Sequence, residues 1–197
     1  MRQSMTVAGT MLLAVTAWAG PVKLSDPTLR ATVKMKNVDG REIAIADVAG
    51  KNGTLVIFSC NHCPFVKAWE TRIAELGNAG PAKGIGVIAI NANDPTAFPE
   101  DSYAEMQARA KARGFTFPYV VDATSAVARG FGASHTPECY LFDRTGTLVY
   151  HGAVDDDKDA AKVTQHWLRD ALDAVAAGQD VPVKETKAIG CSIKFRK

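Results

Sequence analysis

The stretch TLVIFSCNHCPFV, residues 54–66, decides the fold of this chain. Its first half, Thr54 to Ser59, is an apolar run of the kind that forms a strand covered on both faces. A helix is expected to begin near Cys63, because apolar residues then recur along one helical face, at Val66, Trp69, Ile73 and Leu76. Gly77 is placed to end that helix. The stretch therefore predicts a buried strand that leads directly into an amphipathic helix.

Two cysteines, Cys60 and Cys63, form a C-x-x-C motif where that strand ends and the helix begins. The first turn of a helix offers unpaired N–H groups and the positive end of the helix dipole, and both stabilise a thiolate. We expect Cys60 to be the more exposed thiol and the nucleophile, with Cys63 one turn inside as the resolving thiol. His62, when cationic, would further stabilise the Cys60 thiolate. The motif predicts a redox-active dithiol.

Two other interpretations of the same cysteines stay open. The pair could form a purely structural disulfide, or it could supply half of a zinc site. A zinc site needs two more ligands, and no second C-x-x-C or histidine pair stands at the usual spacing.

The elements on either side of this stretch predict an α/β fold. Alternation at residues 31–36 and again at Ile43 and Ile45, around Asp39-Gly40, predicts an N-terminal β-hairpin. Strands that alternate with helices imply a central mixed β-sheet flanked by helices, with a C-terminal tail after it. The further strands are expected at 85–90, 119–121, 139–142 and 148–154, and the helical segments at 99–113, 127–131 and 163–175.

The composition is that of an ordinary globular protein. The 197 residues are 47% hydrophobic and 22% charged, with a formal net charge of +2, which argues against nucleic-acid binding. The length suggests one domain over residues 20–183, followed by a tail, residues 184–197, that carries Cys191. There is no sign of an organic cofactor, since Gly84-Ile85-Gly86 stands before a strand rather than after one.

Residues 1–19 have the pattern of a secretory signal peptide. Arg2 supplies the positive charge, Val7 to Trp18 is apolar, and Ala17-Trp18-Ala19 offers a cleavage site. The apolar run is too short to span a bilayer, and an uncleaved N-terminal anchor is the alternative. We expect a periplasmic or otherwise secreted protein, without stable membrane insertion after cleavage, in a compartment where disulfides persist.

Thr136-Pro137 stands just before the predicted strand 139–142. X–Pro bonds are where cis peptides occur, and an ordinary trans proline at a strand start is the alternative. This dipeptide is the second point in the sequence at which we expect functional chemistry.

These motifs together resemble those of thioredoxin-fold proteins, in particular the bacterial peroxiredoxin-like (redoxin) group. The resemblance runs from about residue 24 to 197 and is carried by Cys60 to Val66, Asn91 to Asp94, Thr136-Pro137 and Gly190 to Lys194. It implies a thioredoxin-like fold in which a proline loop faces the C-x-x-C motif. In that arrangement Thr136 and Pro137 would hold a substrate chain by backbone pairing beside the sulfurs.

Two departures from the family patterns bear on mechanism. Thioredoxins carry a buried acid six residues before their first cysteine, where this chain has Thr54, so another base or water must accept the proton. Typical peroxiredoxins place Thr or Ser three residues before the reactive cysteine. This chain has Cys60 at that distance from Cys63, and Ile57 at that distance from Cys60. A thiol-dependent peroxidase, or antioxidant protein, is therefore kept as a further alternative only.

The remaining cysteines allow more than one role. Cys191 could fold back onto Cys60 or Cys63 as an additional redox thiol, or serve a structural role. Cys139 is interpreted as a packing residue, and a bond between Cys139 and Cys191 cannot be deduced from the sequence.

Histidines supply the competing hypothesis. His135 would join Cys60 and Cys63 in a soft ligand set suited to copper, as in a copper-binding metallochaperone. His151 and His166 are expected at the surface without partners. The main prediction is an exported thiol–disulfide oxidoreductase that acts on protein or small-molecule thiols and disulfides and works with a redox partner protein.

Overall fold

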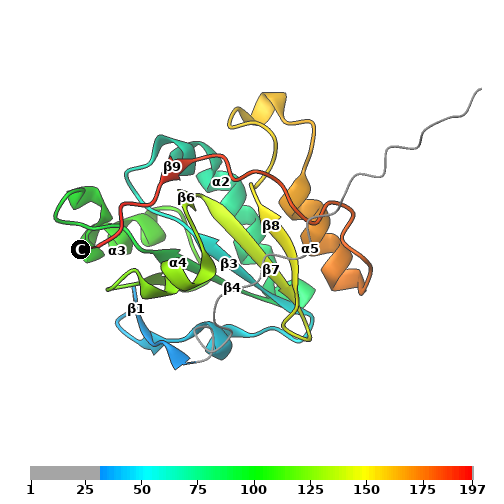
Figure 1. Ribbon diagram of the computed structural model, residues 1–197, viewed down its shortest axis with the longest axis horizontal. Helices are drawn as coiled ribbons and strands as arrows, with labels where there is room; N and C mark the ends of the chain where they lie inside the picture. Colours follow the sequence, from blue (N-terminus) through cyan, green and yellow to red (C-terminus); the bar gives the residue numbers. More distant parts are fainter. Residues whose placement is uncertain (1–31, 197) are drawn as a thin grey trace, which may run out of the picture.

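A seven-stranded mixed sheet forms the centre of the computed structural model, which describes residues 32–196 (Figure 1). The strand order is β2-β1-β5-β4-β3-β7-β8, with β3, β4 and β5 parallel and the other pairings antiparallel. The strands are β1 (Met35–Asn37), β2 (Glu42–Ile43), β3 (Gly53–Phe58), β4 (Ile85–Asn91), β5 (Tyr119–Val121), β7 (Glu138–Asp143) and β8 (Leu148–Gly152). The predicted mixed sheet and N-terminal hairpin are confirmed, whereas the predicted signal peptide lies outside the described residues.

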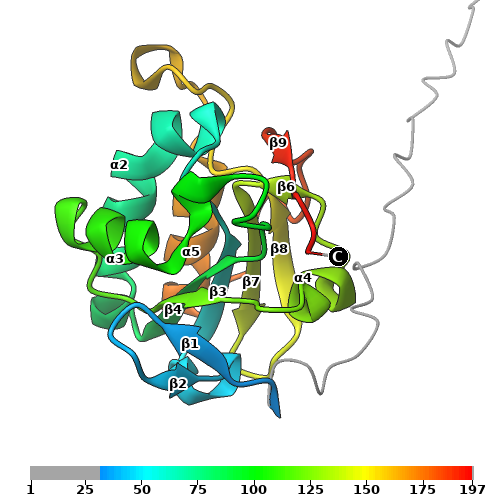
Figure 2. The same ribbon diagram turned by 90° about the vertical axis from the view of Figure 1, so that its left-hand side faces the viewer.

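Helices cover both faces of the sheet (Figure 2). One face packs against α2 (Pro64–Ala79), α3 (Tyr103–Ala112) and α5 (Trp167–Ala177), and the other packs against α4 (Ala126–Phe131). Short 3-10 turns complete the chain, at η1 (Ile45–Val48), η2 (Pro81–Lys83), η3 (Pro99–Asp101) and η4 (Ala160–Lys162). Within residues 32–196, no helix has both the length and the apolar character needed to cross a bilayer.

Strand β3 is buried along its whole length, as its apolar sequence predicts. Because successive side chains point to opposite faces, Leu55 and Ile57 join the core under α2 and α5, while Val56 and Phe58 join the core under α4. Packing on both faces therefore fixes the position of the strand. Cys60, which follows the strand, is placed at one edge of the sheet.

Two predicted helix boundaries were wrong. Helix α2 continues past Gly77 to Ala79. The glycine at position 77 makes room for the ring of Phe117 instead of ending the helix, because a Cβ there would come within 2.3 Å of that ring. The helix predicted over 99–113 is divided into η3 and α3, because Asp101 turns inward to a buried site instead of starting one continuous helix.

The C-terminal tail returns to the sheet edge where the cysteines lie. Its strand β9 (Cys191–Ser192) pairs with β6 (His135–Thr136), and an isolated bridge joins Asn93 to Phe195. Ile193 is buried in the core under α4. The tail is therefore an integral part of the fold.

Candidate functional site

Three thiols from three parts of the chain meet at this edge. Cys60 follows β3, Cys63 is the residue that caps the N-terminus of α2, and Cys191 lies on β9. They pack together with Val66 and Phe65, and Figure 1 shows β6, β9 and α2 converging there. The structure therefore brings together the two cysteines of the C-x-x-C motif and the one in the tail, all as free thiols.

The predicted difference in exposure between Cys60 and Cys63 was wrong. Cys60 is 1% exposed and Cys63 is 0% exposed, whereas Cys191 is partly exposed. The physical reason is that the tail and the loop containing Thr136 lie over the motif, a long-range contact that no local pattern encodes. Helix α2 also begins one residue later than predicted, so Cys63 caps the helix instead of lying inside it.

The site favours a thiolate on Cys63. The neighbouring thiols of Cys60 and Cys191, together with the backbone N–H groups of Val66 and Cys191, lower the pKa of Cys63 to about 4 despite burial. Deprotonation gives up one contact, because the protonated Cys63 Sγ donates to the Thr136 carbonyl oxygen at 3.3 Å.

Cys60 has the opposite environment. Its hydrogen bond to Cys63, its burial and the charge of nearby Asp101 all raise the pKa of Cys60, and a contact of 3.2 Å with the hydroxyl of Thr136 offsets this only in part. This environment disfavours the thiolate that we expected on Cys60, and the choice of attacking thiol stays a prediction.

A buried carboxylate, Asp101, organises the turn between the two cysteines. Its Oδ1 accepts from the backbone N–H of Asn61 at 2.5 Å, and its Oδ2 lies 2.5 Å from Nδ1 of His62. Asn93 donates to the same Oδ2, and the His62 ring stacks on Phe98 with centroids 4.2 Å apart. The position and ring orientation of His62 are therefore set by a residue 39 positions away in the sequence.

Sequence reasoning missed Asp101, because its position carries no distinguishing local signal. It stands in the first turn of a predicted helix, where acidic residues are common and usually solvated. The polar segment Asn91 to Asp94, quoted above for the family resemblance, supplies Asn93 to this carboxylate.

The loop before β7 contributes Thr136 and Pro137, which are joined by a cis peptide bond. Thr136 contacts both Cys60 and Cys63, as described above. The backbone of β6 is already paired with the chain's own β9, in the register Thr136↔Cys191 and His135↔Ser192. A substrate chain expected to pair with Thr136 therefore meets an occupied edge in this structure.

The buried carboxylate of Glu138 holds this loop in place through hydrogen bonds. Burial alone would raise its pKa, but hydrogen bonds from His151, the backbone N–H groups of Ser134 and His135, and Tyr140 leave the pKa lowered. His151 Nε2 lies 2.7 Å from Glu138, so the expectation of a surface histidine without partners was wrong. The signal for this network was a glutamate directly before a wholly apolar strand.

The predicted copper set is not assembled. Thr136 faces Cys60, so His135, next to it on β6, has its side chain directed to the opposite side of the strand, where Nδ1 bonds to Ser134. Among the described residues, the triad of metal-binding side chains within 4.8 Å of one another is Cys60, His62 and Asp101. Its imidazole and carboxylate already bond to each other.

Cys139 takes no part in the thiol cluster. It is fully buried in the core under α2 and α5, and that burial raises its pKa. His166, expected at the surface, is exposed beside the start of α5.

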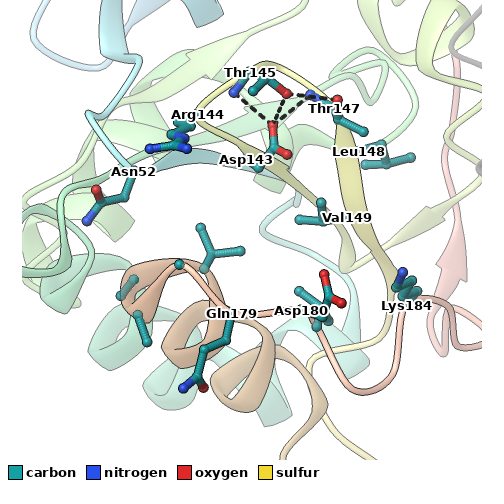
Figure 3. Close-up of a pocket in the computed structure, with 15 residues that line it drawn as sticks. Asn52, Asp143, Arg144, Thr145, Thr147, Leu148, Val149, Gln179, Asp180 and Lys184 are labelled. Atoms are coloured by element: carbon teal, nitrogen blue, oxygen red, sulfur yellow. Dashed lines mark hydrogen bonds between the residues drawn. The ribbon is translucent and has the colours of Figure 1, made fainter.

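A separate hollow lies at the opposite end of the sheet. A cavity of about 620 Å³ is bordered by the β7–β8 turn and the end of α5, with Asp143, Arg144 and Gln179 among its lining residues (Figure 3). Asp143 pairs with Gly53 at the start of β3, whereas the cysteines follow the end of that strand. The cavity is therefore separate from the thiol site.

Comparisons with known proteins agree on fold and family. A conserved protein of Geobacillus kaustophilus superimposes with a TM-score of 0.80 and 40% identity, over 88% of this chain and 91% of that one. A thioredoxin-like protein in the oxidised form superimposes with a TM-score of 0.58 and 20% identity, over 71% and 88% of the two chains, so the fold is thioredoxin-like as predicted. The sporulation thiol-disulfide oxidoreductase A of Bacillus subtilis is 23% identical over 141 residues, which cover 70% of this chain and 82% of that protein.

The family model that matches describes the AhpC/TSA family, and it covers residues 28–151. This span includes the C-x-x-C motif, Asp101 and the Thr136-Pro137 loop. The chain belongs to the AhpC/TSA family, within the thioredoxin-fold redoxins.

Proposed function

We propose that this protein is a thiol–disulfide oxidoreductase whose redox centre is the Cys60–Cys63 pair. The single observation that carries the proposal is the environment of Cys63, the N-cap residue of α2, whose sulfur packs against a second thiol at a strand–helix junction. The 23% identical Bacillus subtilis relative, a named thiol-disulfide oxidoreductase, supports it. Substrates would be thiols and disulfides, with a redox partner protein to restore the starting state.

The reaction is a two-electron exchange. The reduced pair gives two electrons and the Cys60 proton to a substrate disulfide, which takes its second proton from solvent and becomes two thiols, and a Cys60–Cys63 bond forms. The reverse reaction oxidises two substrate thiols, regenerates the Cys60 thiol and the Cys63 thiolate, and releases one proton to solvent. A helix N-terminus favours the thiolate on which both directions depend.

We assign the thiolate to Cys63 and the partner thiol to Cys60, which reverses the roles expected from the sequence. The assignment rests on the lowered pKa of Cys63 and on Asp101 beside Cys60. His62 and Asp101 are positioning residues that hold the turn between the sulfurs.

Reduction of insulin disulfides, with dithiothreitol as the source of electrons, tests the activity. Wild-type protein should accelerate the reduction, and Cys63→Ser should abolish the acceleration. Cys139→Ser is the matched control, because this cysteine lies in the core. A Cys63→Ser variant with wild-type activity would overturn the proposal.

Export is a separate part of the proposal. It is supported by the charged, apolar and small-residue pattern of residues 1–19. When the full-length precursor is produced in a bacterial host, the cleaved protein should be recovered from the periplasmic fraction with Gly20 as its first residue. Recovery of the intact N-terminus on membranes would support the uncleaved anchor instead.

Thiol peroxidase activity is a second candidate, favoured by the family match and by the lowered pKa of Cys63. The attacking Cys63 thiolate would be oxidised to a sulfenic acid and then condense with a neighbouring thiol, with loss of water. Consumption of hydrogen peroxide with dithiothreitol as donor tests it, and a rate no faster in wild type than in Cys63→Ser would exclude it.

A further inference from the structure

We propose that Cys191 is the thiol through which the buried Cys60–Cys63 pair exchanges disulfides with external thiols. Strand β9 holds Cys191 beside β6, at the position where a substrate strand would otherwise pair. This inference rests on the proposed function and extends it to a three-thiol relay. It is carried by strand register, packing and burial.

The register of the tail places the Cys191 side chain over the motif. Residues directly opposite each other in an antiparallel pair have their side chains on the same face, and Cys191 stands opposite Thr136. The Thr136 hydroxyl lies 3.2 Å from the Cys60 sulfur, so that face is the one that looks onto the cysteines. Cys191 accordingly packs against Cys60, Cys63 and Val66.

The approach of the two strands is close enough to require a glycine. A Cβ on Gly190 would come within 2.2 Å of the Thr136 carbonyl oxygen. The small residue before Cys191 therefore allows the tail to lie directly on the loop that contacts both buried sulfurs.

The tail is anchored by the residues that directly follow Cys191. Backbone hydrogen bonds run from Ile193 to Ser134 and from Asp94 to Lys194, and the Asn93 side chain accepts from the Lys194 N–H. These contacts hold the tail in place and keep Cys191 beside Cys63 in the folded protein.

Burial decides which sulfur an outside reactant can reach. Thiol–disulfide exchange needs the attacking sulfur to contact the attacked one. Cys60 and Cys63 expose 1% and 0% of their surfaces, and Cys191 is the partly exposed member of the cluster. An outside thiol can therefore meet Cys191 without opening the fold.

The relay balances as two exchanges followed by release. Burial raises the pKa of Cys191 to about 11, so in the oxidised protein the Cys191 thiol must first lose its proton. Its sulfur then attacks Cys63, the Cys63–Cys191 bond forms, and Cys60 leaves and takes up a proton. A thiolate of an external dithiol then attacks Cys191, and Cys63 leaves as the thiolate that its hydrogen bonds stabilise. The second thiol of the external dithiol then attacks the dithiol sulfur that is bonded to Cys191. A disulfide forms within the external dithiol, and Cys191 is released as the thiol. The dithiol is oxidised by two electrons and the protein is reduced by two.

The first test measures how fast a reduced protein dithiol, thioredoxin, reduces the oxidised full-length chain, by acid quench and thiol trapping. Cys191→Ser should slow the reaction at least about tenfold, because the pair is then reached only through opening of the tail. Ser192→Ala, its matched control on the same strand, should stay within about twofold of wild type. Equal rates for wild type and Cys191→Ser would overturn the relay.

The second test traps the intermediate. Mild oxidation of Cys60→Ser should give a Cys63–Cys191 disulfide by mass mapping, and its absence would overturn the relay. A wild-type chain without a reversible Cys60–Cys63 disulfide overturns the proposed function and the relay together. A reversible couple with equal rates in the first test overturns the relay alone.

Discussion

At the scale of single residues, Cys63 shows how a folded chain can make one thiol acidic by surrounding it with donors. Each donor directed at the sulfur favours the charged form of Cys63, and together these donors outweigh its burial. The donors come from the motif itself, from the first turn of α2 and from the tail, so the acidity of Cys63 depends on the complete fold.

The first prediction concerns the titration of Cys63. Because its pKa is lowered from 9.0 to about 4, the reduced chain should carry one thiolate at neutral pH, visible as thiolate absorbance in the ultraviolet. The thiolate adds stability to the reduced fold that is fully present above pH 9.0 and is lost as pH falls toward 4. Cys63→Ser should lack both effects. Absorbance that develops only near the ordinary thiol pKa would contradict the prediction.

The second prediction concerns Asp101. In the wild type, backbone N–H groups donate to the Asp101 carboxylate, and Asp101→Asn replaces this carboxylate with an amide. The free energy of unfolding, measured with denaturant, should fall by roughly 1–3 kcal/mol. The same substitution should also lower the pKa of Cys60, since the charge of Asp101 helps to raise it. Glu100→Gln, an exposed neighbour, is the control and should change stability by less than about 0.5 kcal/mol. An unchanged Cys60 titration would leave Asp101 a purely structural role.

The candidate site was only partly predictable from the sequence. The two motif cysteines and Thr136-Pro137 carry local signals, namely spacing and a strand–helix junction. Asp101 carries none that distinguishes it from a solvated helix start, because its role arises from contacts with residues far away in the chain.

At the scale of elements, the periodic segments were predictable and their ends were not. Strands β3, β4 and β5 match the predicted runs to within one residue, because continuous burial leaves a clear pattern. Helix α5 begins at Trp167, later than Val163 suggested, since residues 160–162 form a separate 3-10 turn. The pairing of β9 with β6 had no local signal, because a two-residue strand has no period.

The third prediction follows from the glycine inside α2. At an exposed helical position, Gly→Ala stabilises by roughly 1 kcal/mol. At Gly77 the added methyl group meets the Phe117 ring, so Gly77→Ala should instead destabilise by roughly 1–3 kcal/mol in denaturant unfolding. In a Phe117→Leu background the same change should cost less. Stabilisation in the wild-type background would contradict the packing described.

At the scale of the whole molecule, the fold places two buried sulfurs at one sheet edge and covers them with its own C-terminus. The sheet and helices form a thioredoxin-like frame, and the tail occupies the strand edge beside the motif. In the proposed relay, exchange with partners would therefore depend on the tail as well as on the two motif cysteines.

The fourth prediction is a reduction potential. A stabilised Cys63 thiolate favours the reduced protein, so the Cys60–Cys63 couple should lie above thioredoxin's value of about −270 mV. Because Cys63 stays deprotonated above about pH 4, reduction takes up one proton, and the potential should fall by about 30 mV per pH unit. A slope of about 59 mV per unit near neutral pH would mean that both thiols are protonated and that the assigned thiolate is wrong.

The central claim is tested most directly by mapping disulfides in the full-length chain poised in glutathione buffers, with thiols trapped and the peptides identified by mass. We predict a reversible two-electron couple in which Cys60 and Cys63 are joined in the oxidised wild-type protein, while Cys139 stays reduced throughout. Absence of a reversible Cys60–Cys63 disulfide across the buffer series would contradict the claim.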